Sequence, residues 1–175
     1  GGEPTEGAVD EAYRHAITKL SYLHFTSTEQ YRKRVIQLGE NPLRVFNVGA
    51  LGVENILKES LPSKEELEES LNFRLRPQFV VVTYHPVTLE STSSEGGFKA
   101  LLKALDAFPD LGILFTKTNA DADGRIINNL MDEYVSYRPN AIAVASLGMK
   151  QYLSAVDHSV AVVGNSSSGI IEVPS

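Results

Sequence analysis

Short runs of apolar, mostly β-branched residues alternate with segments of helical spacing along the second half of the chain. The runs predict strands at 78–84, 111–117, 141–145 and 160–163. Helical spacing predicts helices between them at 97–108, 124–137 and 149–156. Nearly continuous apolar strands that alternate with helices are typical of a parallel sheet covered on both faces, with right-handed crossovers. The pattern therefore predicts an α/β fold with parallel strands.

The first part of the chain shows the same alternation less regularly. Helices are expected over 8–20 and 28–38, strands over 21–26 and 44–48, and a short helix over 53–57 inside a connecting region, 49–62. Thr28 is the expected N-cap of the second helix and Gly39 its terminator. The segment Ser63–Glu66 has the form of a capping box, which predicts a polar helix to about Leu71. We place the boundary between the two parts in the connecting region.

Composition narrows the classes of function. Of 175 residues, 42% are hydrophobic, which supports a folded core. The net charge is −6 and no block of basic residues stands out, so nucleic acid is not expected as a partner; the basic cluster Tyr31–Arg34 is interpreted as a solvated helix face. The absence of cysteine excludes disulfides, thiolate metal sites and a cysteine nucleophile.

Two further expectations concern location and length. No apolar run reaches membrane-spanning length and no signal peptide is visible, so we expect a cytoplasmic protein without a membrane partner. The chain opens with Gly1–Pro4 and closes at Glu172–Ser175, where a helix would be interrupted. We interpret it as an internal fragment of a longer protein.

The most informative stretch is Val160–Gly169, in which an apolar run ends at Gly164 and a turn of small polar residues leads into a helical segment. In an open α/β sheet, such a turn lies at the carboxyl edge, where helix N–H groups can bind phosphate. Serine hydroxyls add donors. The alternative is an ordinary turn with serine as the N-cap.

His85 stands at the end of a predicted buried strand and directly before Pro86. Proline restricts the preceding residue to extended conformations, which would hold the imidazole at the carboxyl edge, facing the same crevice as residues 164–169. A histidine that merely caps the strand is the alternative. For His24 and His158 we expect structural roles. The loop Ser91–Gly97 follows the same strand and is expected to be a flexible substrate lid.

Acidic residues gather at the amino end, where Glu3, Glu6, Asp10 and Glu11 precede Arg14 and His15. Carboxylates in a first helical turn suit the helix dipole, which explains most of them. Acid, base and cation also share one helix face, as proton transfer at a sugar carbon requires. The acidic loop Asn119–Gly124 lacks the later glutamate of an EF-hand and fits a loop in a nucleotide-binding sheet better. No residue set has convincing zinc spacing.

Four stretches together resemble the UDP-N-acetylglucosamine 2-epimerases. They are Gly1–Glu3, Asp10–Lys19, His85–Thr88, and Gly164–Ser167 with Glu172. The resemblance implies a GT-B-like pair of Rossmann-like domains with the active site between them. Residues 1–52 would be the last part of the first domain, and residues 53–175 most of the second, UDP-binding domain. The segment His85–Thr88 is similar to the hydrolysing branch of sialic acid biosynthesis, whereas non-hydrolysing members usually carry a His-Arg-Arg-type motif there.

The resemblance also implies a reaction and roles. UDP would be eliminated from UDP-GlcNAc to give 2-acetamidoglucal, and water would add to give N-acetylmannosamine, without a metal or redox cofactor. The implied catalytic residues are Glu3, Asp10 or Glu11, Arg14, His15 and His85. His85 would also contact the diphosphate, Ser166 and Ser167 would hold phosphate oxygens, Glu172 would bind the ribose hydroxyls, and Asn119 and the backbone near Leu147 would lie around the nucleotide.

The full-length protein is expected to be a homodimer, and the isolated fragment to be inactive. A hydrolysing epimerase acting on UDP-diacetylbacillosamine, a GT-B glycosyltransferase and a non-catalytic nucleotide-binding module stay open as alternatives.

Overall fold

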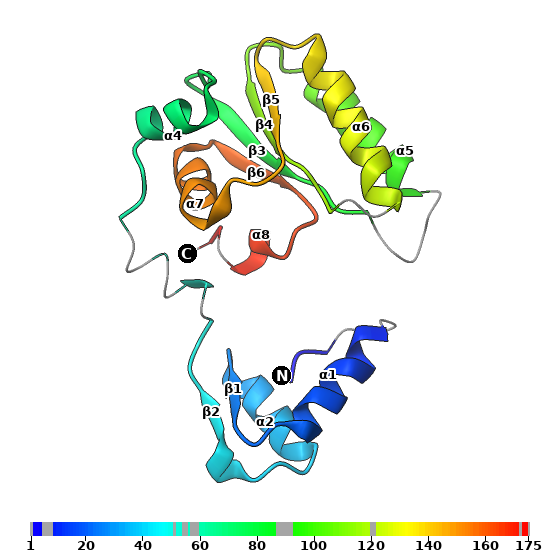
Figure 1. Cartoon of the computed structure of the whole chain (residues 1–175), viewed down its shortest axis with the longest axis vertical. Helices are drawn as coiled ribbons and strands as arrows, with labels where there is room; N and C mark the ends of the chain where they lie inside the picture. The colour runs from blue at the N-terminus through cyan, green and yellow to red at the C-terminus, as the bar shows by residue number, and fades with distance from the viewer. Residues whose placement is uncertain are drawn as a thin grey trace. The chain divides into compact units, whose positions relative to one another are not determined.

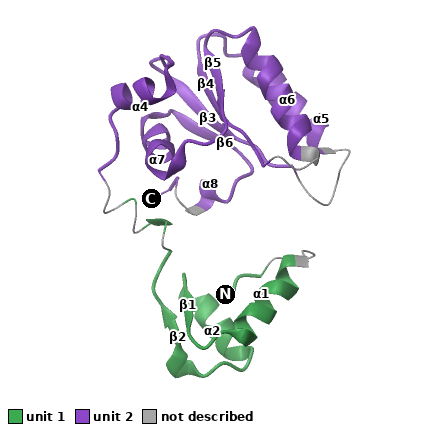
Figure 2. Ribbon diagram, in the orientation of Figure 1, with its two compact units in different colours: residues 1–58 green, residues 59–175 purple. Residues whose placement is uncertain are grey.

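The computed structural model divides into two compact units, Gly1–Lys58 and Glu59–Ser175 (Figures 1 and 2). It describes residues 2–4, 9–50, 52–53, 56, 60–86, 93–119, 122–171 and 173–174. The division falls inside the connecting region 49–62. Of the short helix expected over 53–57, Val53 and Ile56 are helical and the other positions lie outside the described residues.

Unit 1 is a small α/β unit. Its elements are α1 (Val9–Leu20), β1 (His24–Thr26), α2 (Glu29–Gln37), the 3₁₀ helix η1 (Pro42–Arg44) and β2 (Val45–Asn47). The two strands pair in parallel, with His24 opposite Val45. The predicted caps of α2 are confirmed: the Thr28 hydroxyl accepts a hydrogen bond from Tyr31 N at 3.2 Å. Gly39 follows the helix at φ +92°, the left-handed conformation that ends helices.

A side-chain contact between His24 and Glu40 ties β1 of unit 1 to the segment after α2. His24 is only 8% exposed, and its Nε2 lies 3.2 Å from Glu40 Oε2. Lys19 Nζ donates to Glu40 Oε1 at 2.8 Å. This hydrogen bond from Lys19, followed by the charge of Lys19 and the contact with His24, lowers the pKa of Glu40 against the opposing effect of burial. The contacts of His24 agree with the structural role expected for it.

Unit 2 contains a four-stranded parallel sheet, as predicted. Its elements are α4 (Lys64–Leu71), β3 (Phe79–Thr83), α5 (Ser93–Leu105), β4 (Gly112–Thr116), α6 (Ala122–Ser136), β5 (Ala141–Val144), α7 (Gly148–His158), β6 (Ala161–Gly164) and α8 (Ser168–Ile171). The strand order is β5-β4-β3-β6. The chain thus builds the sheet from β3 towards β5 and then returns to add β6 on the other side of β3. This reversal creates a topological switch point between β3 and β6, the place where open α/β sheets bind ligands.

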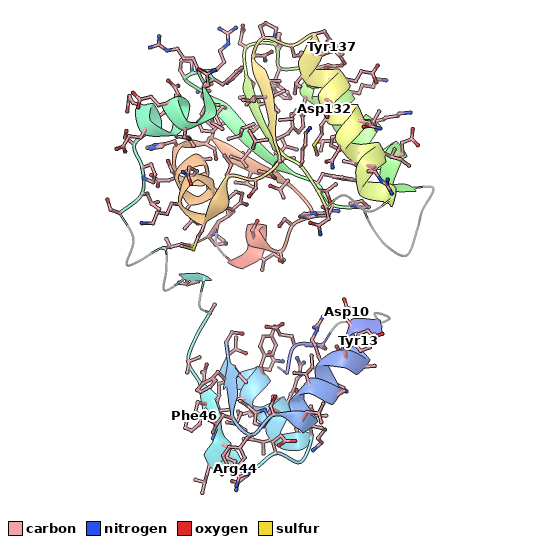
Figure 3. The ribbon with its side chains drawn as sticks, in the orientation of Figure 1. Asp10, Tyr13, Arg44, Phe46, Asp132 and Tyr137 are labelled. Carbon is pink, nitrogen blue, oxygen red and sulfur yellow. The ribbon has the colours of Figure 1, made fainter. Side chains whose placement is uncertain are left out.

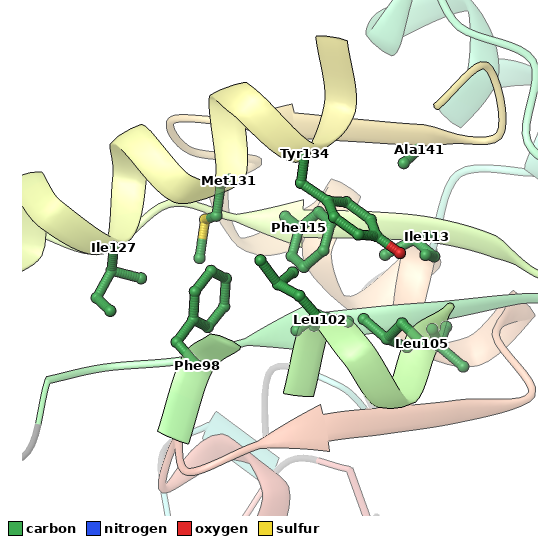
Figure 4. Close-up of a cluster of buried hydrophobic side chains, with 11 residues drawn as sticks. Phe98, Leu102, Leu105, Ile113, Phe115, Ile127, Met131, Tyr134 and Ala141 are labelled. Atoms are coloured by element: carbon green, nitrogen blue, oxygen red, sulfur yellow. The ribbon is translucent and has the colours of Figure 1, made fainter. Parts of the chain in front are cut away.

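Helices cover both faces of this sheet (Figure 1). On one face, Phe98 of α5 and Tyr134 of α6 pack edge to face against Phe115 of β4 (Figure 4). On the other face, α4 and α7 contribute Leu67 and Ala155, both fully buried. Full burial of a large apolar side chain stabilises the fold by about 1.5–3 kcal/mol. These two clusters explain why the strands are nearly continuous apolar runs.

Helix α4 begins with the predicted capping box. Ser63 Oγ accepts from Glu66 N at 3.2 Å, and Glu66 Oε2 accepts from Ser63 N at 2.8 Å. The helix ends at Asn72, which has φ +47°. None of the helices in the described part of the chain is long and apolar enough to cross a membrane.

The prediction of a flexible lid over Ser91–Gly97 is wrong for residues 93–97, which form the start of α5; residues 91 and 92 lie outside the described residues. The Tyr84 hydroxyl donates to Ser94 O at 3.1 Å. A Cβ on Gly97 would lie 2.8 Å from the Tyr84 hydroxyl oxygen, so glycine here allows close packing. Phe98 is fully buried and anchors this part of α5 in the core. Tertiary contacts therefore override the local preference of a serine- and glycine-rich segment for a loop.

Candidate functional site

The centre of the site in unit 2 is a double hydrogen bond across the switch point. His85 follows β3, and Asn165 follows β6. The side-chain amide of Asn165 accepts from His85 N at 2.7 Å and donates to His85 O, also at 2.7 Å. One side chain thus satisfies both backbone groups of a residue 80 positions away. This contact places His85 and the turn at residues 164–169 side by side at the carboxyl edge of the sheet, in agreement with the expectation that they share a crevice.

Gly164 makes this close approach possible. It has φ +147°, and a Cβ placed on it would lie 1.8 Å from Thr83 O. No side chain could occupy that position, because the obstructing atom belongs to the backbone of β3. Asn165 N donates to the same Thr83 oxygen at 3.3 Å. Glycine therefore fixes the separation of β3 and β6 where the site begins.

The imidazole of His85 is exposed but is held on one side. Its Nδ1 lies 3.2 Å from the hydroxyl of Thr118, a residue that follows β4 and is 9% exposed. Asn128, on α6, accepts from Thr118 N and donates to Thr118 O, both at 3.0 Å. The ends of β3, β4 and β6 therefore meet around His85, as the carboxyl ends of parallel strands must.

The serine turn after Gly164 combines an N-cap with unused donors. Ser166 Oγ accepts from Ser168 N at 3.3 Å and from Ser168 Oγ at 3.1 Å, and Tyr152 OH lies 2.6 Å from Ser168 Oγ. The side chain of Ser167 is exposed. Within the residues that the structure describes, the N–H groups of Ser166 and Ser167 have no hydrogen-bond partner. Both expectations for this turn, a serine N-cap and donors that an anion could use, therefore agree with its geometry.

The other predicted nucleotide-binding residues of unit 2 lie as follows. Asn119 directly follows Thr118 and is exposed. Leu147 follows β5 at the N-terminus of α7, and its side chain packs against the cluster that contains Leu67. The Leu147 side chain is only partly buried there. Glu172 lies outside the described residues.

The predicted acid–base residues gather in unit 1. On α1, His15 Nε2 lies 3.2 Å from Glu11 Oε1, and Arg14 Nη1 lies 4.0 Å from Glu11 Oε2. Arg14 Nη1 also donates to the backbone oxygen of Glu3 at 3.4 Å. Asp10 is exposed on the same helix (Figure 3), whereas Glu6 lies outside the described residues. Acid, base and cation thus share one helix face, as predicted.

A hollow of about 200 Å³ opens beside this cluster. Its lining residues are Gly2, Glu3, Pro4, Glu11, His15, Arg34, Gln37 and Leu38. Arg34 Nη1 donates to Gly2 O at 3.4 Å. The interpretation of the basic cluster Tyr31–Arg34 as a solvated face is therefore wrong for Arg34, which turns back onto the amino-terminal segment. The helical pattern alone gave no sign of this, because the partner is a backbone oxygen 32 positions away.

Sequence analysis also missed the residues that support His85. Asn165 lies within the stretch Val160–Gly169, and its position directly after a predicted strand could have identified it. No local pattern indicated Thr118 or Asn128, because their hydrogen bonds join a loop to the middle of a helix. In the described ranges, no three His, Asp or Glu side chains form a group that could hold a metal ion. The acidic loop 119–124 is only partly within those ranges.

Sequence comparison gives a family match over the whole chain. The model of the family described as UDP-N-acetylglucosamine 2-epimerase matches residues 1–175. A Campylobacter jejuni protein named GDP/UDP-N,N'-diacetylbacillosamine 2-epimerase (hydrolyzing) is 42% identical over 99% of this chain and 46% of its own length. The Escherichia coli polysialic acid biosynthesis protein P7 is 45% identical over 100% of this chain and 44% of its own length. The chain thus spans about half the length of these curated relatives.

Solved structures agree on the fold. The Neisseria meningitidis UDP-GlcNAc 2-epimerase bound to UDP-GlcNAc superposes with a TM-score of 0.72 at 16% identity, covering 97% of this chain and 47% of that chain. The Staphylococcus aureus MnaA–UDP co-structure gives a TM-score of 0.66 at 16% identity, covering 93% of this chain and 42% of that one. The predicted α/β fold class with parallel sheets is confirmed. Given the family match over all 175 residues, the chain belongs to the UDP-N-acetylglucosamine 2-epimerase family.

Proposed function

We propose that this chain forms part of a hydrolysing 2-epimerase that converts UDP-GlcNAc and water to N-acetylmannosamine and UDP. The observation that carries the proposal is the switch point of unit 2, where His85 is clamped beside the free N–H groups of Ser166 and Ser167. An imidazole on a clamped backbone, next to unused backbone donors, suits a diphosphate, which needs several donors from one side. Relatives named as hydrolysing 2-epimerases, at 42% and 34% identity, support the reaction class.

In the proposed first step, the Glu3 carboxylate removes the proton from C2 of the sugar while the C1–O bond to UDP breaks. This elimination gives 2-acetamidoglucal and UDP. His85 acts at the opposite group: its Nε2 contacts the diphosphate and favours its departure. In the second step, water adds at C1, and a proton returns to C2 on the face opposite to that from which it left. The product is N-acetylmannosamine, and no metal or redox cofactor takes part in the scheme.

The cluster in unit 1 supports a division of labour among its residues. Arg14 holds the Glu3 backbone and lies beside Glu11, while His15 contacts the other oxygen of Glu11. Because Glu11 lines the same hollow as Glu3 and His15, we assign the second acidic position to Glu11 in preference to Asp10. Arg14 and His15 then keep a proton relay and positive charge next to the reacting carbon.

The nucleotide contacts are assigned to unit 2. Ser166 and Ser167 would hold phosphate oxygens, Glu172 the ribose hydroxyls, and Asn119 and the backbone at Leu147 would border the nucleotide. Unit 2 would then be most of the UDP-binding domain and unit 1 the last part of the first Rossmann-like domain. Since the curated relatives are about twice as long as this chain, we propose that turnover requires a longer polypeptide, acting as a homodimer, and that the chain alone is inactive.

A second substrate has specific support. The relatives from Campylobacter jejuni and Legionella pneumophila are named for N,N'-diacetylbacillosamine. The same elimination and water addition on UDP-diacetylbacillosamine would release a diacetamido sugar in place of N-acetylmannosamine. The two candidates differ only in the sugar, so the released product separates them.

The test uses the complete protein that contains this chain, incubated in D₂O with each UDP-sugar. NMR identifies the released sugar and measures deuterium at C2, which elimination and re-addition must introduce. Glu3→Gln should lower turnover by roughly 10²–10⁴, the usual contribution of general base catalysis, with UDP binding retained. Glu69→Gln, an exposed position on α4, is the matched control. Product without deuterium at C2 would exclude the elimination route and favour a glycosyltransferase or simple hydrolase, and failure to bind UDP would refute the function altogether.

A further inference from the structure

Thr118 is a buried polar residue whose hydroxyl must be satisfied from within the site. At 9% exposure it has little access to water, and burying a hydroxyl is costly unless it is hydrogen-bonded. Among the residues that the structure describes, the partner of its Oγ1 is Nδ1 of His85, at 3.2 Å. A valine of the same shape would fit the end of an apolar strand equally well, so the hydroxyl calls for an explanation beyond packing.

A hydroxyl beside Nδ1 suits a histidine that donates a hydrogen bond from Nε2. The nitrogen that carries the proton is determined by the partner of the opposite nitrogen. A backbone carbonyl can only accept, and would therefore place the proton on Nδ1. A hydroxyl can also donate to Nδ1, which places the proton on Nε2, and it can accept from Nδ1 when the ring is charged. Thr118 thus suits a His85 ring whose Nε2–H is directed at an anion.

Two asparagine side chains hold the backbone on each side of this contact. Asn128 binds both backbone groups of Thr118 at 3.0 Å, and Asn165 binds both backbone groups of His85 at 2.7 Å. The Thr118 backbone is thus held by α6, and the His85 backbone by the turn after β6. These supports fix the two backbone positions from which the imidazole and the hydroxyl reach each other.

We propose that Thr118 is a positioning residue that keeps the neutral His85 ring in its Nε2–H form and directs this donor at the leaving diphosphate. The inference rests on the proposed function for the identity of the anion, but not for the geometry of the ring. Removal of the Thr118 hydroxyl without a change in shape should therefore impair His85. In this proposal His85 contacts the substrate and Thr118 does not.

The test compares Thr118→Val with Thr118→Ser by NMR of the ¹⁵N-histidine-labelled chain, with His85→Gln used to assign the His85 signals. In the wild type and in Thr118→Ser, we expect the shifts of a dominant Nε2–H tautomer. In Thr118→Val, the two ring nitrogens should move towards the averaged shifts of a tautomer mixture. Thr116→Val is the matched control, because Thr116 lies two residues earlier and its hydroxyl bonds Thr83, at 2.8 Å, rather than His85.

Kinetics of the complete protein supply the second readout. Thr118→Val should lower kcat about tenfold, the rate equivalent of one lost hydrogen bond, and Thr118→Ser should restore it. Unchanged His85 signals in Thr118→Val, or an equal change in Thr116→Val, would overturn the inference even if the enzyme is a 2-epimerase. Conversely, absence of UDP binding and turnover in the wild type would refute the proposed function, while the NMR comparison would still decide the role of Thr118.

Discussion

Replacing Gly164 by alanine should damage unit 2 severely, because the new methyl group has no space. At φ +147° a residue with a side chain is strained, at a cost of about 1–3 kcal/mol. The added Cβ would also lie 1.8 Å from Thr83 O, an overlap that only a movement of β6 away from β3 can relieve. Overpacking of this kind typically costs about 1–3 kcal/mol more. We therefore expect a loss of about 2–6 kcal/mol, a large share of the 5–15 kcal/mol that stabilises a typical domain.

Urea unfolding followed by far-UV circular dichroism measures this loss. With an m-value of about 1–3 kcal/mol/M, the midpoint should fall by roughly 1 M or more. Gly169→Ala is the matched control, because this glycine lies one turn further on, in α8, and a Cβ on it would meet nothing within 4 Å. That variant should be neutral or slightly more stable, since alanine is the better helix former by about 0.5–1 kcal/mol.

Gly164→Ala also tests the site. Because Gly164 sets the distance across which Asn165 binds His85, any Gly164→Ala protein that still folds should bind UDP more weakly, as measured by calorimetry. Glu69→Gln, at an exposed position on α4, is the control for binding and should bind UDP as the wild type does. Equal unfolding midpoints for Gly164→Ala and Gly169→Ala would refute the argument that β3 and β6 require glycine at their closest approach.

Three further perturbations follow from the described contacts. Ser63→Ala removes half of the capping box of α4 and should cost about 0.5–2 kcal/mol in urea unfolding, whereas an unchanged midpoint would show that Glu66 alone caps the helix. Asn165→Ala should weaken UDP binding about tenfold in calorimetry by releasing the His85 backbone, and unaltered affinity would contradict the clamp. Glu40 has a pKa lowered below 4.5, chiefly by its hydrogen bond with Lys19, so the stability it contributes is present above that value and is lost as the pH falls through its folded-state pKa. Acid unfolding of Glu40→Gln should lack this component, and identical pH profiles would refute it.

The sequence predicted the elements of unit 2 well because each strand is apolar on both faces. Strands 79–83, 112–116, 141–144 and 161–164 all lie within two residues of the expected ranges. The order of the strands was not predicted, since the pairing of Val80 with Ala161 joins positions 81 residues apart. Local patterns specify where a strand begins and ends, but not which strand lies next to it. The switch point between β3 and β6 therefore became visible only in the structure.

The candidate site was predictable to the extent that it follows from strand ends. His85 and Asn165 each come directly after a strand, and parallel strands bring their carboxyl ends to one edge. The support of His85 by Thr118 and Asn128 was not predictable, because a buried threonine and a helix-interior asparagine each have a commoner local explanation. Arg34 was misjudged for the same reason: helical spacing describes the neighbours along the helix and not the chain that crosses it.

Three glycines lie at close contacts between segments, where the sequence alone would suggest turns or loops. Sequence analysis associates glycine with turns and flexible loops, yet a Cβ on Gly2, Gly97 or Gly164 would lie 2.3, 2.8 or 1.8 Å from an atom of Tyr31, Tyr84 or Thr83. Each glycine is therefore a point of close approach between distant segments. Gly2 directly precedes Glu3, and Gly164 directly precedes the residue that clamps His85, so both lie where a chemical group must be held against another element. In this chain, Gly2 and Gly164 beside candidate site residues mark close backbone contacts and not flexible loops. Such a contact cannot be recognised from the neighbouring sequence, because the contacting residue lies elsewhere in the chain.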